Sequence, residues 1–137
     1  MKRHVACALL CIFTIFSVSA LEWPTDTHRF LRLFGQNIGG HTFEQGLAFE
    51  NTETARTADD GVLLVTLDVR HEMGRFPSTL GNAAILLHTD GLQTIYGNLA
   101  GTAALSTRIA VEANSVIGRT GSSGWGKEND LLFQVSD

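Results

Sequence analysis

The histidines are the side chains with the most versatile chemistry in this sequence. Beyond the first 20 residues they stand at His28, His41, His71 and His88. No two of them are spaced as His-x-His or His-x-x-x-His, the spacings that bring two imidazoles to one metal ion on a strand or a helix. His41 precedes Glu44 by three residues but lies in a glycine-rich loop. The spacing therefore favours solvated or hydrogen-bonded histidines over a metal site.

Residues 1–20 have the pattern of a secretory signal peptide. Lys2 and Arg3 precede an apolar run over 5–16, and small residues lead up to Ala20. We expect cleavage after Ala20 and export to the periplasm or cell envelope. The apolar run is shorter than a membrane span needs, so no stable span is expected after cleavage. An uncleaved N-terminal anchor is the alternative.

Cleavage would also remove both cysteines, Cys7 and Cys11. The mature chain would then offer no disulfide, no cysteine zinc site and no thiol nucleophile. Without Lys2 and Arg3, eight basic residues face 14 acidic ones, which gives a net charge of −6. An acidic exported chain without a basic stripe does not suit a nucleic-acid ligand, and we expect none.

After residue 20, the sequence predicts strands separated by turns. With 137 residues, 44% of them apolar, the chain has the size for one domain with a buried core. Strands at this spacing indicate an all-β sandwich or barrel. Residues 25–34 fit either a short amphipathic helix or an extended strand. The predicted strands are 43–50, 62–69, 84–88, 92–96, 108–112, 115–119 and 130–135, and the predicted loops are 36–42, 51–60 and 70–78.

The stretch 80–99 predicts a hairpin at the centre of the fold. Its first strand is apolar on both of its alternating sides, so we expect it to be buried on both faces. Asp90-Gly91 supplies the backbone conformation of a tight turn. The chain returns through Tyr96, and Asn98 continues the face on which Tyr96 lies.

Several segments of the chain share the pattern of one protein family. These segments are 34–35, Gly46, 58–62, 80–82, His88, 91–99 and 116–124. Taken together, they resemble the lysostaphin/LytM-like zinc endopeptidases, which cut peptide cross-links in bacterial peptidoglycan. The resemblance covers residues 31–137 and favours a strand for residues 31–34. It implies a single small all-β domain, a LytM-like β-sandwich or barrel of the duplicated hybrid motif type, after an N-terminal segment 21–30.

The resemblance also implies which positions would bind zinc, and here the sequence departs from the family. Aligned on Gly46, the histidine of the family's His-x-Gly-x-Asp loop falls on Glu44 and the aspartate falls on Ala48. The third ligand, the second histidine of a His-Leu-His strand, falls on Leu132. Ala48 and Leu132 carry no ligating atom, and one carboxylate does not hold zinc. We therefore expect no zinc cofactor.

The acid–base positions that the resemblance implies are also replaced. The histidine of the family's Tyr-x-His segment falls on Asn98, whose amide cannot take up a proton. The first histidine of His-Leu-His falls on Asp130, which would repel developing negative charge. No catalytic residue is therefore assigned, and we expect no enzymatic activity.

A binding groove is the part of the site that the resemblance leaves in place. Trp125 would lie near its rim, where an exposed indole could stack on a sugar or a stem peptide. The alternative is a tryptophan packed under its own loop. The polar floor of the groove is expected to come from Tyr96, Asn98, Asp130 and Gln134. On the last strand, Leu131, Phe133 and Val135 are expected to face the core.

The sequence thus predicts an exported, non-catalytic domain that binds peptidoglycan or regulates a cell-wall hydrolase. The first alternative is a zinc-dependent peptidoglycan endopeptidase whose ligands are relocated to other histidines. The second is a structural envelope protein without a ligand. Domains of this family continue past the position of Asp137, so we expect a C-terminally shortened domain or a shortened reading frame, with an exposed sheet edge.

Overall fold

The computed structural model describes residues 20–68, 79–102 and 105–137, and in these ranges all regular secondary structure is β. The predicted signal peptide, apart from Ala20, and the whole of the predicted loop 70–78 lie outside them. The predicted all-β class is confirmed. The strands are β1 (Phe30–Arg32), β2 (Asn37–Gly39), β3 (Thr42–Phe43), β4 (Leu47–Phe49), β5 (Thr54–Arg56), β6 (Gly61–Leu67), β7 (Asn82–His88), β8 (Gln93–Leu99), β9 (Ala110–Val111), β10 (Val116–Arg119) and β11 (Leu131–Ser136).

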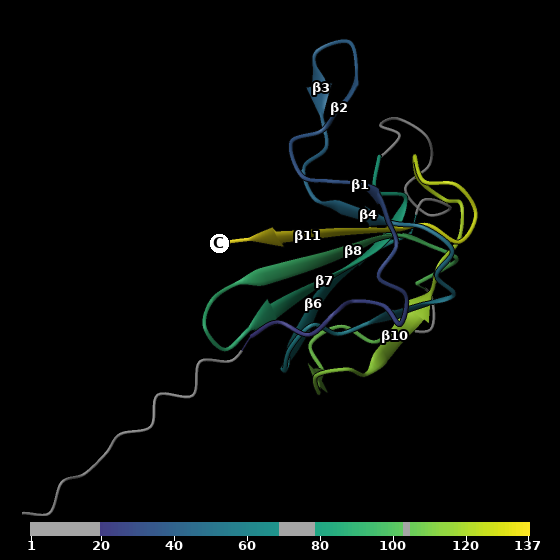
Figure 1. The fold of residues 1–137 in the computed structure, drawn as a ribbon. Helices are drawn as coiled ribbons and strands as arrows, with labels where there is room; N and C mark the ends of the chain where they lie inside the picture. Colours follow the sequence, from purple (N-terminus) through teal and green to yellow (C-terminus); the bar gives the residue numbers. More distant parts are fainter. Residues whose placement is uncertain (1–19, 69–78, 103–104) are drawn as a thin grey trace, which may run out of the picture.

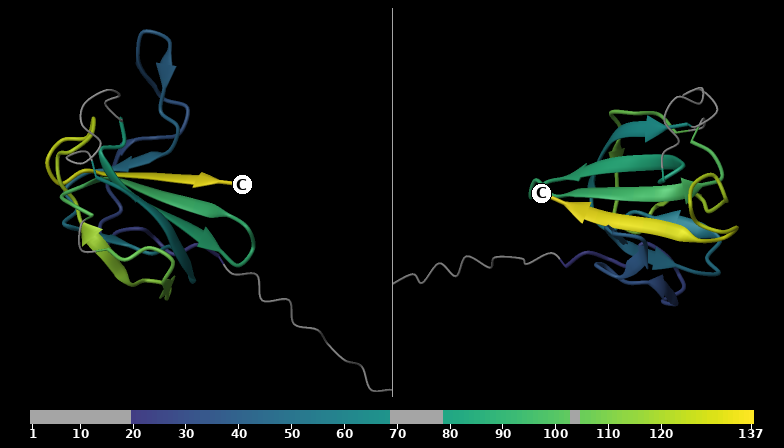
Figure 2. Two further views of the ribbon diagram at one scale, coloured as in Figure 1. Left: turned by 180° about the vertical axis from the view of Figure 1, so that it is seen from behind. Right: turned by 90° about the horizontal axis from the view of Figure 1, so that it is seen from above.

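A seven-stranded antiparallel sheet in the order β1-β4-β11-β8-β7-β6-β9 is the main layer of the fold. Its long central strands fan out side by side (Figures 1 and 2). β11, the last strand along the chain, lies in the middle of the sheet between β4 and β8. The sheet therefore places the last strand directly beside β4, with β1 on the other side of β4.

The predicted hairpin of β7 and β8 forms the centre of this sheet. Gly91 adopts a φ of +91°, which favours glycine, and the side chain of Asp90 accepts a hydrogen bond of 3.0 Å from the Leu92 amide. The expected burial holds on one face of β7, where Leu86 is fully buried, but Leu87 on the other face is only half-buried. One face of the sheet thus carries the core.

The second layer covers the core face. It consists of the β5–β10 ribbon and of residues 20–29, whose backbone follows β5. The Arg56 amide, for example, donates to the Pro24 carbonyl at 2.9 Å. Buried apolar side chains of both layers meet between them, as expected for a two-layer β domain. These are Phe49, Ala55, Ala58, Leu63, Ala84, Leu86, Tyr96, Leu99, Ile117, Leu131 and Phe133.

A chain of buried polar groups runs through this core. The Nδ1 atom of His88 lies 2.9 Å from the Asp60 carbonyl, and its Nε2 lies 2.7 Å from the Thr94 hydroxyl. That hydroxyl lies 3.2 Å from the hydroxyl of Tyr96, which accepts a 2.7 Å hydrogen bond from the Ala58 amide. A carbonyl can only accept, so the Nδ1 of His88 carries a proton. His88 is a hydrogen-bonded core histidine.

Three local predictions need correction. Of the alternatives for residues 25–34 the strand is right, but it is limited to β1. The predicted strand 43–50 is two strands, β3 and β4, because β3 pairs with β2 in a hairpin that replaces the predicted loop 36–42. The predicted loop 51–60 contains β5, which pairs with β10 far along the chain. A strand made by long-range pairing leaves little local signal.

Residues 20–68, 79–102 and 105–137 contain no helical segment with the length and hydropathy that a membrane-spanning helix requires.

We expect Tyr96→Phe to lower the free energy of unfolding by about 1–3 kcal/mol, because it leaves the buried Ala58 amide without its acceptor. Urea unfolding with an unchanged m-value measures this loss. Ser106→Ala, which removes an exposed hydroxyl, is the control. Its free energy of unfolding should stay within about 0.5 kcal/mol of that of the parent.

The same phenol predicts a pH dependence. Burial raises the pKa of Tyr96 above its ordinary value of 10.0, and the hydrogen bonds from Thr94 and Ala58 oppose part of this shift. The unfolded chain then loses the proton first, so the stabilisation is complete below pH 10 and decreases as the pH rises further. Between pH 9.5 and 11 the parent should lose more stability than Tyr96→Phe. Equal losses of stability in the parent and in Tyr96→Phe would contradict a raised pKa of Tyr96.

Candidate functional site

Three residues form a row across the edge of the main sheet that lies away from β9. Arg32 of β1 pairs with Ala48 of β4, and Ala48 pairs with Leu132 of β11. Directly opposed residues in adjacent strands point to the same face, so the three side chains share one face. Ala48 and Leu132 are two of the three positions to which the resemblance assigns zinc ligands. The structure therefore brings these positions together and adds an arginine beside them.

An irregularity in β1 turns Arg32 toward this face. Phe30 pairs with Phe49 while Arg32, two residues on, pairs with Ala48, so the strand contains a bulge. A bulge re-aims a side chain relative to its neighbours. Phe30 packs against the Phe49 ring, with their centroids 5.1 Å apart, whereas Arg32 lies on the opposite face above the small Ala48.

Arg32 forms an ion pair with Glu44, the remaining position of the implied zinc site. The Nε of Arg32 lies 2.6 Å from the Oε2 of Glu44, and the side chains are 23% and 11% exposed. A carboxylate this sheltered needs a positive or hydrogen-bonding partner, and the guanidinium supplies both. A cationic side chain of the protein thus lies among the three positions at which the resemblance implies zinc ligands.

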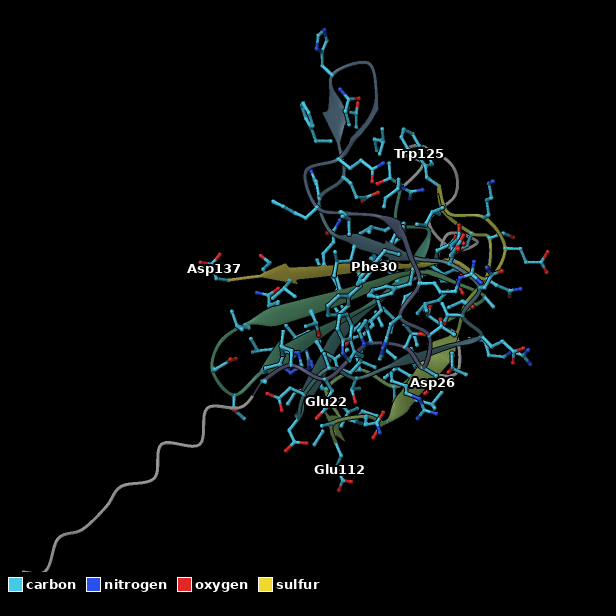
Figure 3. All side chains as sticks on the ribbon, in the orientation of Figure 1. Glu22, Asp26, Phe30, Glu112, Trp125 and Asp137 are labelled. Carbon is cyan, nitrogen blue, oxygen red and sulfur yellow. The ribbon has the colours of Figure 1, made fainter. Side chains whose placement is uncertain are left out.

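The ion pair lies in a hollow between the β2–β3 hairpin and the loop that carries Trp125. Two adjoining spaces of about 360 and 170 Å³ share Arg32, Ile38 and Trp125. Figure 3 shows Trp125 beside the base of the hairpin, which stands away from the sheet. Trp125 is 65% exposed, so it forms the rim and is not packed under its own loop. The other lining side chains include those of Phe43, Glu44, Leu132 and Gln134.

Asn98 does not face this hollow. Its side chain is fully buried, and its Nδ2 lies 2.8–2.9 Å from the carbonyls of Gly121, Lys127 and Asp130. Its Oδ1 accepts a 2.9 Å hydrogen bond from the Gly124 amide. Asn98 therefore holds the loop 121–130, and its φ of +63° departs from the extended backbone that the predicted alternation along this strand assumes. The groove position that the resemblance implies for Asn98 is wrong.

Two further groove predictions also need correction. Tyr96 is fully buried in the core, and Asp130 is 4% exposed and accepts a 2.8 Å hydrogen bond from the Lys127 amide inside the loop. Gln134 alone of the four floor residues lines the hollow. On β11, Leu131 and Phe133 face the core as predicted, but Val135 is 46% exposed.

The residues at the implied zinc positions do not fit a zinc ion. They present a methyl group, an isobutyl group and a carboxylate that already binds a guanidinium at 2.6 Å. Elsewhere, His28 packs on Trp23, His41 is exposed and His71 lies outside the described residues. Among the described residues, no three histidine, cysteine, aspartate or glutamate side chains gather as a metal site requires.

Arg32 is a site residue that sequence patterns do not reveal. It is the one basic residue in the apolar run 30–34, and the bulge that turns its side chain toward the site depends on strand pairing.

Comparison with known proteins identifies relatives of this chain. The family model described as Peptidase family M23 matches residues 42–137. A protein of Treponema pallidum (strain Nichols), described as uncharacterized, is 37% identical over an alignment 139 positions long, which covers 94% of this chain and 95% of that protein.

Solved structures share the fold. A zinc-containing peptidase from Vibrio cholerae superimposes with a TM-score of 0.68 at 20% identity, over 85% of this chain but only 36% of that longer chain. The catalytic domain of lysostaphin from Staphylococcus simulans gives a TM-score of 0.64 at 20% identity, over 78% of each chain. At such identities the likeness concerns the fold alone.

We expect Asn98→Asp to destabilise the protein by about 3 kcal/mol, because a carboxylate of the same shape would face three carbonyl oxygens. Urea unfolding measures this loss, and hydrogen exchange of the Gly124 amide should become faster. The matched control is Asn129→Asp, since Asn129 has the same φ of +63° and is exposed. Equal losses of stability in Asn98→Asp and Asn129→Asp would show that the hydrogen bonds of the Asn98 side chain contribute nothing to stability.

Proposed function

This chain belongs to peptidase family M23, and from that premise we propose that it is an exported, non-catalytic member that binds peptidoglycan at the hollow beside Trp125. The observation that carries the proposal is the Arg32–Glu44 ion pair above Ala48 and Leu132. A cationic side chain in place of a metal ion offers no Lewis acid and no activated water. The hollow around this ion pair still offers side chains that can contact a ligand.

The lining of the hollow supports binding of a wall fragment. Trp125 presents a large exposed ring at the rim, on which a sugar ring or a short peptide can stack. Gln134 adds an amide for hydrogen bonds, and Ile38 and Phe43 add apolar surface. A concave site with apolar walls and a few polar groups is typical of ligand binding. Export, suggested by residues 1–20, would bring the hollow to the cell wall.

Regulation of a cell-wall hydrolase is the second candidate. The β2–β3 hairpin and its approach carry exposed apolar side chains, with Leu33 53%, Phe34 75% and Phe43 55% exposed. Clustered exposed apolar residues on a projecting hairpin are typical of a protein-binding surface. The two candidates predict different effects of substituting Phe34, which is not among the residues that line the hollow. The substitution should weaken binding to a hydrolase but not binding to peptidoglycan.

We expect the purified protein to cosediment with purified peptidoglycan sacculi, and Trp125→Ala to reduce the bound fraction at least about fivefold because the stacking surface is lost. Val116→Ala is the control, since Val116 is 54% exposed on β10, away from the hollow. Equal binding by Trp125→Ala and the parent would contradict the proposal. So would a chelator-sensitive release of peptides from the sacculi.

A further inference from the structure

Arg32 has hydrogen-bonding capacity that the ion pair does not use. Among the described residues, the only polar contact of its side chain is the one from Nε to Glu44, and no described residue contacts its two terminal nitrogens. These nitrogens carry four N–H donors in the plane of the guanidinium. Because Glu44 holds the Nε, the plane is already fixed, and little further ordering is needed to bind a ligand.

We propose that the terminal nitrogens of Arg32 receive a peptide carboxylate, so that the hollow selects a peptide with a free carboxylate over the same peptide without one. This inference rests on the proposed function and names the part of the ligand that the hollow recognises. Two parallel N–H donors match the two oxygens of a carboxylate.

The charge in the hollow favours a singly charged group. Among the described residues that line the two adjoining spaces, Arg32 is the one basic residue and Glu44 is the one acidic residue. A phosphate with two negative charges would meet a single guanidinium next to a carboxylate, whereas a carboxylate meets a matching fork. Ile38, Phe43 and Leu132 would contact the apolar part of a short peptide, and the Gln134 amide would face its backbone.

Glu44 offers a substitution that should strengthen binding of the carboxylate. Its charge orients Arg32 but also repels an incoming carboxylate. Glu44→Gln keeps an oxygen that can accept from the Nε and removes the repulsion. We therefore expect Glu44→Gln to bind a carboxylate more tightly than the parent does, a gain that a purely structural role for this pair would not produce.

Isothermal titration calorimetry of the purified protein with N-acetyl-D-alanyl-D-alanine and its C-terminal amide tests the inference. We expect the acid to bind at least about tenfold more tightly than the amide. Arg32→Gln should abolish the preference, Arg32→Lys should weaken it, and Glu44→Gln should raise the affinity for the acid about threefold or more while the amide is unaffected. If Arg32→Gln fails to fold, the other two variants decide the question.

The exposed pair of Arg29 and Glu50, whose Nη2 and Oε1 lie 2.9 Å apart, supplies the matched controls. Arg29→Gln and Glu50→Gln should leave the preference for the acid unchanged. N-acetyl-glutamate α-amide, which has only a side-chain carboxylate, shows whether the carboxylate must be at the chain end. Binding of either carboxylate through Arg32 supports the inference.

The two proposals fail in different ways. Equal affinities for the acid and the amide, with sacculus binding intact, would overturn the carboxylate inference alone. A preference for the acid without any sacculus binding would overturn the proposed function and leave the inference standing.

Discussion

The structure of the site depends on one buried amide. Asn98 holds the loop 121–130 through three carbonyls and one backbone amide, and the loop in turn carries Trp125 to the rim of the hollow. The backbone of Trp125 is fixed from the other side, because its amide donates to the Thr79 carbonyl at 2.9 Å. Gly126 lies so close to Asn98 that an added Cβ would come within 2.5 Å of Nδ2. At the position where the resemblance implies a catalytic histidine, this chain thus has a group that orders the loop beside the hollow.

The second constraint is electrostatic, and it explains why the changes at the implied zinc site belong together. Glu44 is 11% exposed and needs a cation, and Arg32 reaches it across Ala48, which has only a methyl group. An aspartate at position 48 would add a second carboxylate beside one guanidinium, and a histidine at position 132 would fill apolar space that Leu132 now occupies. Restoring one ligand alone would therefore disturb the ion pair without creating a metal site.

Much of the fold could be predicted from sequence because its signals are local. The alternation in β7 and β8 and the turn at Gly91 predicted the central hairpin. The alternation in the first part of β11 predicted the core face that includes Phe133. The bulge in β1 and the pairing of β5 with β10 depend on contacts distant in sequence, so local patterns reveal neither the role of Arg32 nor the strand β5. The groove position of Asn98 is what the resemblance implies, but its buried side chain and its φ of +63° direct it to the loop 121–130 instead.

In this M23 domain an arginine–glutamate pair lies where the resemblance implies a zinc site. The most direct test is the zinc content of the untagged chain 21–137 after dialysis against micromolar zinc, measured by atomic absorption. The account predicts close to zero zinc per chain. One tightly held zinc per chain would contradict it and would direct attention to His71 and the other histidines as ligands.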